Sequence, residues 1–405
     1  MTGKPIFIHS LFRTGSTYIW NKFRQNDNYY CYYEPLHPAL AHVTKDNIEN
    51  LMTKDFGSVN HPSLNKYYLY EYSSILDTKG PGVRYFKKSF SFDEFCNNKK
   101  NPALKKYIDH LIYNAGEKTP LFQFNRTALR VKWFKENYPD SLNIYLVRQP
   151  RDQWQSYFEI QQKTNYSVFF VMDLLTASIN KKTGYFKPLA RGIPLLKYRH
   201  RDFEKDERFY RLLLDSYPEE DRYFIFYYTW LRALVENVIY ADFVLNINLL
   251  SQDTVYREAF SSFLKKNDIN DIDFEDSRLS KYSSYLLSQE VMTEIEEKSR
   301  QLLLQSIPTQ MNLFFEKISS FDEKYFQFQR ESFTDLPLNK KEETLKRKEP
   351  EYKKLKRDIQ KILNSHMVRT GKNLLLPCKR FRRLLKDLKK NGREDKKDNE
   401  LALKL

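Results

Sequence analysis

Short apolar segments alternate with segments of helical periodicity along most of this chain. Runs rich in β-branched and aromatic residues predict strands, which lie at residues 6–9, Tyr29–Tyr33, Pro120–Phe124, Leu142–Val147 and Phe243–Asn248. Apolar residues at helical spacing predict helices, at Thr17–Arg24, about Thr127–Asn137, from Pro150 past Tyr157, near Tyr227–Val238, and at about 253–266 and 288–305. This alternation predicts an α/β fold of three layers, with a central, mostly parallel sheet between helices.

Polar and charged residues follow the predicted strands directly. They are Arg13 after the first strand, Glu34 after the second, Gln123, Asn125 and Arg126 at the end of the third, and Arg148 after the fourth. In a parallel sheet the binding site lies beyond the carboxyl ends of the strands. We therefore expect these side chains to share one pocket.

The segment after the first strand has the pattern of an anion site. A strand, a hydroxyl-rich turn around Gly15 and a helix N-terminus bring free N–H groups and the helix dipole together. Alignment with the triphosphate-binding pattern Gly-x-x-x-x-Gly-Lys-Ser/Thr puts Ser10 at the first Gly and Ser16 at the Lys, so that beyond Gly15 only Thr17 fits. The missing Lys disfavours a P-loop small-molecule kinase. Arg13 supplies a planar, permanently charged group instead, which suits a smaller anion bound without a metal.

Two motifs resemble those of a known family. Phe12-Arg13-Thr14-Gly15-Ser16-Thr17 is similar to the 5′-phosphosulfate loop of the sulfotransferases that use 3′-phosphoadenosine 5′-phosphosulfate (PAPS), particularly the carbohydrate-type branch. The family's second motif is a strand followed by Arg, with Ser eight residues later, and here Leu146-Val147-Arg148 is followed by Ser156. The resemblance implies that Arg13, Thr14, Gly15, Ser16 and Thr17 hold the 5′-phosphosulfate, and that Arg148 and Ser156 hold the 3′-phosphate. Many relatives have Asp where Gln149 stands. The motifs cover about residues 5–160, and more loosely 240–275.

The resemblance also implies a reaction, the transfer of a sulfuryl group from PAPS to an acceptor hydroxyl, on a carbohydrate or glycoconjugate and without a metal. Tyr33-Glu34-Pro35-Leu36 is similar to the segment in which carbohydrate sulfotransferases carry their general base, so Glu34 is the candidate base. Burial among its aromatic neighbours would raise its pKa. Alternatively, Glu34 only pairs with Arg13 or Arg148.

Other residues have candidate roles in the same reaction. In the cytosolic branch of the family the base is a histidine, which makes His37 and His9 rivals of Glu34, although a core position suits His9 better. Arg13 would stabilise the leaving phosphate. Gln123, Asn125 and Arg126 would contact the acceptor or the cofactor.

The positive charge of the chain is concentrated in its last part. Residues 339–405 have a net charge of +13, and the remaining residues a net charge of +3. We therefore divide the chain into a sulfotransferase domain at 1–335 and a basic, helical extension at 336–405. Phe381, Leu384, Leu385 and Leu388 lie at helical spacing among Lys and Arg residues, which is typical of a basic amphipathic helix on an anionic membrane. Few stacking aromatics occur there, which disfavours nucleic acid as a partner.

The location of the protein is also an expectation. Three widely spaced cysteines favour a reducing compartment. The first strand begins at Ile6, which leaves no room for a signal peptide, and no stretch approaches the roughly 20 apolar residues that span a bilayer. We expect a cytoplasmic protein that could contact the inner membrane face through its tail. A non-catalytic nucleotide- or membrane-binding protein stays open as an alternative to the enzyme.

Overall fold

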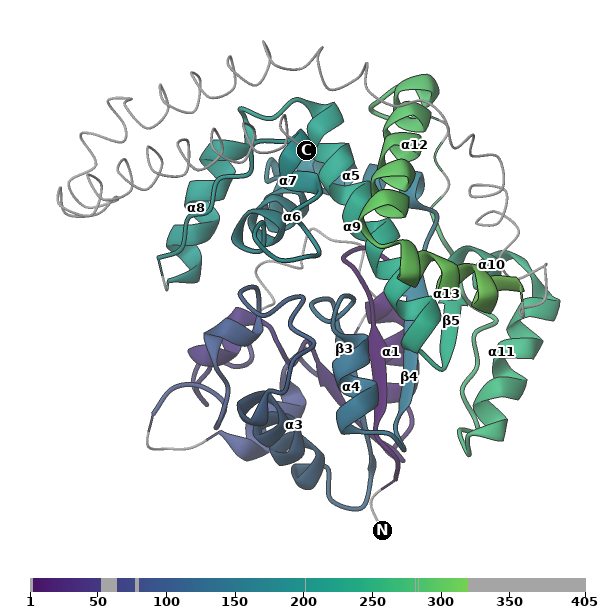
Figure 1. The fold of residues 1–405 in the computed structure, drawn as a ribbon. Coiled ribbons are helices and arrows are strands. Elements are labelled where there is room, and N and C mark those ends of the chain that lie inside the picture. Colours follow the sequence, from purple (N-terminus) through teal and green to yellow (C-terminus); the bar gives the residue numbers. More distant parts are fainter. Residues whose placement is uncertain are drawn as a thin grey trace. The chain divides into compact units, whose positions relative to one another are not determined.

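The fold was analysed in a computed structural model that describes residues 3–51, 64–76, 80–200, 202–280, 282 and 284–319 (Figure 1). The predicted basic extension at 336–405, its amphipathic helix and the domain boundary at 335 lie outside the described residues.

A five-stranded sheet forms the centre of the described residues. Its strands are β1 (Ile6–His9), β2 (Tyr29–Tyr33), β3 (Thr119–Phe124), β4 (Leu142–Val147) and β5 (Phe243–Asn246). They lie in the order β2-β3-β1-β4-β5, and every neighbouring pair is parallel. Nearly every strand residue is buried, as expected for a sheet covered on both faces. The prediction of an α/β fold with a mainly parallel sheet is confirmed.

Helices surround this sheet. The α-helices are α1 (Ser16–Arg24), α3 (Pro102–Asn114), α4 (Val131–Asn137), α5 (Pro150–Thr164), α6 (Val168–Ile179), α7 (Leu189–Gly192), α8 (Phe203–Leu214), α9 (Glu219–Tyr240), α10 (Ile247–Gln252), α11 (Thr254–Lys266), α12 (Gln289–Ser306) and α13 (Pro308–Ser319). Three short 3₁₀ helices are η1 (Pro38–Ala41), η2 (Tyr70–Ile75) and η3 (Lys88–Phe90). No helix among these is long and apolar enough to cross a membrane.

Three predicted boundaries were wrong, two of them for a local reason that the structure shows. The helix expected from Thr127 begins at Val131, because residues 127–130 form a turn closed by the Arg130 N–H on the Thr127 carbonyl. The strand expected to reach Asn248 ends at Asn246, whose side chain accepts from the N–H groups of Asn248 and Leu249 and so starts α10. Helix α9 begins at Glu219, eight residues before the predicted start.

The carboxyl ends of the strands meet at one edge of the sheet. His9 of β1 is in register with Phe124 of β3 and with Tyr145 of β4. The segments that follow these strands therefore leave the sheet side by side. Helices α5, α6, α7 and α8 lie beyond this edge (Figure 1). Arg13, Glu34 and Arg148, which follow β1, β2 and β4, therefore lie at this edge of the sheet.

Candidate functional site

The loop between β1 and α1 holds Arg13 in a left-handed backbone conformation. Arg13 has φ +62° and Gly15, the N-cap of α1, has φ +91°. No side chain caps this helix, and its first intrahelical bonds are those of the Tyr18 and Ile19 N–H groups to the Gly15 carbonyl. The N–H groups of Ser16 and Thr17 precede these bonds. Free N–H groups at a helix N-terminus are suited to an anion.

Asn125 connects this loop to the neighbouring strand β3. Its Oδ1 accepts from Ser10 Oγ, from Ser16 Oγ at 3.1 Å and from Gln123 Nε2 at 3.0 Å. All four residues are buried. Gln123 and Asn125, expected at the acceptor or cofactor, therefore hold the backbone of the loop in place through side-chain contacts.

The loop hydroxyls already have partners inside the protein. Thr14 Oγ1 donates to the Leu11 carbonyl at 3.0 Å, and Thr17 Oγ1 lies 3.1 Å from the Tyr33 hydroxyl. A hydroxyl has one hydrogen and can rotate. The Thr14 hydroxyl would thus have to rotate to donate to a ligand, whereas the backbone N–H groups need no such change.

Arg148 lies at the end of β4, beside the loop. One of its Nη atoms donates to the Arg13 carbonyl at 3.2 Å, and its guanidinium lies 6.0 Å from the centre of the Tyr282 ring. The side chain is buried, with 5% of the residue exposed. The predicted proximity of the Arg13 loop and Arg148 is therefore present in the structure.

The guanidinium groups of Arg13 and Arg148 have no counter-charge among the described residues: neither forms an ion pair with a carboxylate there, and the Nε atom of each is buried without a hydrogen-bond partner. Burial lowers the pKa of Arg13, and the positive charge of Arg148 lowers it further. Arg13 is half-buried and Arg148 is buried. Two cations that lie close together and partly out of water are unfavourable unless an anion binds between them.

Ser156 is one and a half turns into α5, which begins at Pro150 as predicted. Its hydroxyl is buried and donates to the Gln153 carbonyl at 2.6 Å, within the same helix. The Gln153 side chain in turn donates from Nε2 to the Phe12 carbonyl at 2.7 Å. This hydrogen bond between Gln153 and Phe12 connects helix α5 to the Arg13 loop, and the sequence did not indicate it.

Glu34 follows β2 and pairs with Arg126. Arg126 Nη1 lies 2.7 Å from Glu34 Oε2, and the Asn125 N–H donates to the same oxygen at 3.4 Å. Both side chains are 4% exposed. Burial raises the pKa of Glu34 and Arg126 opposes this shift. The alternative that Glu34 pairs with Arg13 or Arg148 is wrong for this structure, since its partner is Arg126. Glu34 also has φ +47°, a strained value for a residue with a side chain.

The two histidines occupy different environments. His37 caps η1, where its Nδ1 accepts from the Ala39 N–H at 3.2 Å, and burial together with Arg126 lowers its pKa well below the usual range. His9 is fully buried and bonded at both nitrogens, to Thr127 at 2.7 Å and Asn143 at 3.1 Å, and burial lowers its pKa to about 4. The prediction that His9 is a core residue is confirmed.

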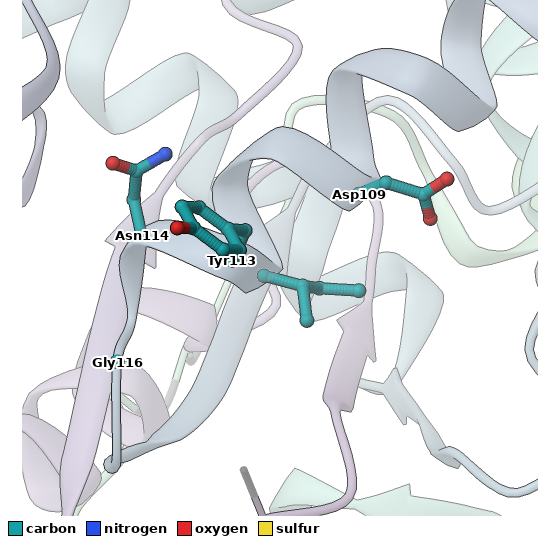
Figure 2. A pocket seen from close by; sticks show the side chains of 5 residues that line it. Asp109, Tyr113, Asn114 and Gly116 are labelled. Atoms are coloured by element: carbon teal, nitrogen blue, oxygen red, sulfur yellow. The ribbon is translucent and has the colours of Figure 1, made fainter.

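A surface hollow lies away from these residues. It is lined by Asp109, Ile112, Tyr113, Asn114 and Gly116, at the end of α3 and just before β3 begins (Figure 2). None of the predicted site residues lines it. In the described part of the chain no three His, Cys, Asp or Glu side chains gather closely enough to hold a metal ion.

Comparisons of the chain with protein-family models, with curated proteins and with solved structures find no match.

Proposed function

We propose that this protein is a PAPS-dependent sulfotransferase that transfers a sulfuryl group to an acceptor hydroxyl, on a carbohydrate or glycoconjugate. The observation that carries this proposal is the pair of neighbouring guanidinium groups of Arg13, which is half-buried, and Arg148, which is buried; neither has a carboxylate partner in the part of the chain that the structure describes. Two adjacent cations match a ligand with two phosphate groups. The order of the motifs, each after a strand, supports PAPS as that ligand.

In this proposal the cofactor lies along the carboxyl edge of the sheet. The N–H groups of Ser16 and Thr17, together with Arg13, hold the 5′-phosphosulfate, and Arg148 and Ser156 hold the 3′-phosphate. Arg13 stabilises the charge that develops on the bridging oxygen as the bond to sulfur breaks. The site needs no metal for this step.

Glu34 is the base that receives the proton of the acceptor hydroxyl in this mechanism. The hydroxyl oxygen attacks sulfur, the bond from sulfur to the phosphate oxygen breaks, and PAP leaves. The ion pair with Arg126 fixes the carboxylate of Glu34, and burial keeps its pKa above the ordinary value. His37, with a lowered pKa, is neutral near pH 7 and helps to shape the turn after Glu34.

The two-phosphate site can be tested by calorimetry with PAP, with AMP, which lacks the 3′-phosphate, and with 3′-AMP, which lacks the 5′-phosphate. We expect PAP to bind about ten to one hundred times more tightly than either monophosphate, because each phosphate gains charge-assisted hydrogen bonds. Arg148→Gln should weaken PAP and 3′-AMP but leave AMP unchanged, whereas Arg13→Gln should weaken PAP and AMP. Equal binding of the three ligands would contradict the proposal.

A further inference from the structure

His37 lies in the turn that follows β2 and leads into η1. Its backbone N–H donates to the Glu34 carbonyl at 2.8 Å, and the next residue, Pro38, is the first of η1. Proline suits this position because it has no N–H and its φ is already helical. The His37 side chain caps the helix, since its Nδ1 accepts from the Ala39 N–H at 3.2 Å. The backbone and the ring of His37 are therefore both held in this turn, three residues after Glu34.

The capping bond determines which ring nitrogen of His37 carries the proton. A backbone N–H can only donate, so Nδ1 presents its lone pair, and the single proton of a neutral imidazole is then on Nε2. Burial and the charge of Arg126 lower the pKa of His37 well below its usual range, so the ring is neutral near pH 7. A second proton could enter only at Nδ1, where the cap would be lost. His37 is thus suited to donate a hydrogen bond from Nε2 and unsuited to act as a base.

The Nε2 donor of His37 is accessible. Within the described parts of the chain the hydrogen bonds of this side chain end at Ala39, and Nε2 is not among the buried polar atoms without a partner. The residue as a whole is half-buried. His9 differs in both respects, because it is fully buried and both of its nitrogens are bonded to neighbours. A ligand can therefore reach the donor of His37 but not that of His9.

The order of the strands separates His37 from the proposed phosphate sites. Arg13 follows β1 and Arg148 follows β4, and these two strands are neighbours. His37 and Glu34 follow β2, which is separated from β1 by β3. Neighbouring strands are about 4.8 Å apart, so the end of β2 lies about 10 Å from that of β1 and about 14 Å from that of β4. The donor of His37 therefore lies on the side of the candidate base, away from the 3′-phosphate.

We infer that His37 binds the acceptor: its Nε2–H donates a hydrogen bond to an oxygen atom of the sugar, while Glu34 receives the proton of the hydroxyl that reacts. The inference rests on the proposed function, because the base and the cofactor define where the acceptor lies. The donor requires an oxygen lone pair, which a sugar supplies as a hydroxyl, a ring oxygen or the carbonyl of an N-acetyl group. His37 thus orients the acceptor and is not a second base.

NMR of the full-length chain with ¹⁵N-labelled histidine tests the protonation of His37 without any ligand. Long-range correlation of the ring hydrogens with the ring nitrogens distinguishes the two neutral tautomers and the cation. We expect a neutral ring with its proton on Nε2, unchanged between about pH 8 and pH 6, whose signals are missing in His37→Asn. A proton on Nδ1, or a ring that becomes a cation within this range, overturns the inference.

The variant His37→Asn separates acceptor binding from capping. Asn is also a good N-cap, so it can accept from the Ala39 N–H, but it has no donor at the place of Nε2. The probe is a pool of neutral and acidic oligosaccharides. At a low concentration of this pool we expect the conversion of PAPS to PAP to slow by about threefold to tenfold, the effect of one hydrogen bond. At a saturating concentration the rate should recover to within about twofold, because uniform binding was lost. PAP affinity and the unfolding midpoint should not change.

The matched control is His42→Asn, because His42 is exposed and lies at the other end of η1, and this variant should keep the full rate. Equal rates of His37→Asn and the unsubstituted protein would show that His37 is only a cap, which overturns the inference. A loss of at least about a hundredfold that persists at saturation also overturns it, since removal of a base has that effect. If the unsubstituted protein fails to bind PAP or to convert PAPS, the proposed function itself is wrong and the inference falls with it, so the two failures are distinguishable.

Discussion

Arg148 and Arg151 are three residues apart, and their removal should have opposite effects on stability. Arg148 is buried without a carboxylate partner within the described ranges and lies near a second cation, Arg13. Arg151 pairs through two nitrogens with Glu296, at 2.8 Å and 3.0 Å, and Glu296 is 7% exposed. A residue whose role is to bind a ligand can lower the free energy of unfolding of the ligand-free protein, whereas a residue whose role is structural raises it.

The magnitudes follow from these contacts. Arg148→Met loses the hydrogen bond to the Arg13 carbonyl, which contributes roughly 1–2 kcal/mol for a charged donor. It also removes an unpaired buried cation, whose burial costs several kcal/mol. We therefore expect the free energy of unfolding to rise by about 1–3 kcal/mol. Arg151→Met leaves the buried Glu296 carboxylate without its cation and should lower the free energy of unfolding by about 2–4 kcal/mol.

Thermal and urea unfolding of the two variants, with and without PAP, measures both effects. We expect the midpoint of Arg148→Met to rise by about 2–4 °C without ligand. The rise in the midpoint that PAP produces in the unsubstituted protein should be mostly lost in this variant. A decrease in the stability of ligand-free Arg148→Met comparable to that of Arg151→Met would contradict this expectation, because it would show that Arg148 supports the folded structure.

Three further substitutions have expected outcomes. Glu34→Gln should reduce the rate at which PAPS is converted to PAP by at least about a hundredfold, as expected when a general base is removed, measured with a pool of glycan acceptors. The affinity for PAP should stay within a few fold of that of the unsubstituted protein. Full activity of the variant would exclude Glu34 as the base. His9 has a pKa of about 4 in the folded protein against about 6.5 when unfolded, so stability should be lost as the pH falls from 6.5 to 4. Between pH 7 and 5 this loss should be roughly 2 kcal/mol in urea unfolding and should be absent in His9→Gln; equal pH dependence in the two proteins would contradict it. Gly15→Ala should lower the free energy of unfolding by about 1–2 kcal/mol and should also lower the affinity for PAP. The reason is that Gly15 has φ +91° and that a Cβ atom there would lie 3.3 Å from Ile247 Cγ2. An unchanged PAP affinity would show that the turn is not part of the anion site.

The sheet and the positions of the site residues could be predicted from the sequence because their signals are local. Each strand is a short apolar run, and the carboxyl ends of parallel strands must meet at one edge. This reasoning placed Arg13 and Arg148 together although 135 residues separate them. The start of α9 was predicted wrongly, although Pro218 and three acidic residues in the first turn are a local signal for it.

The partners of these residues could not be predicted in the same way. Arg126 is the ion-pair partner of Glu34 because β2 and β3 are neighbours, and the neighbours of a strand are not encoded in its own residues. Helix α6 is mostly apolar, and its sequence only indicates burial. The place of its first turn beside the Arg13 loop follows from the packing of Phe169 on Phe12, a tertiary contact that cannot be read from the spacing of residues along the chain.

The proposed function requires that the loop around Arg13 and the end of β4 bind a nucleotide with a 3′-phosphate and a 5′-phosphate, and that they do so without a metal. Calorimetric titration of the full chain with PAP in the presence of EDTA, and with ATP in the presence of Mg²⁺, tests it most directly. We expect saturable, micromolar or tighter binding of PAP without metal and at least about a hundredfold weaker binding of ATP, since Ser16 stands at the position of the Lys that contacts the β- and γ-phosphates. Binding of ATP with Mg²⁺ as tight as that of PAP, or no binding of PAP, would contradict it.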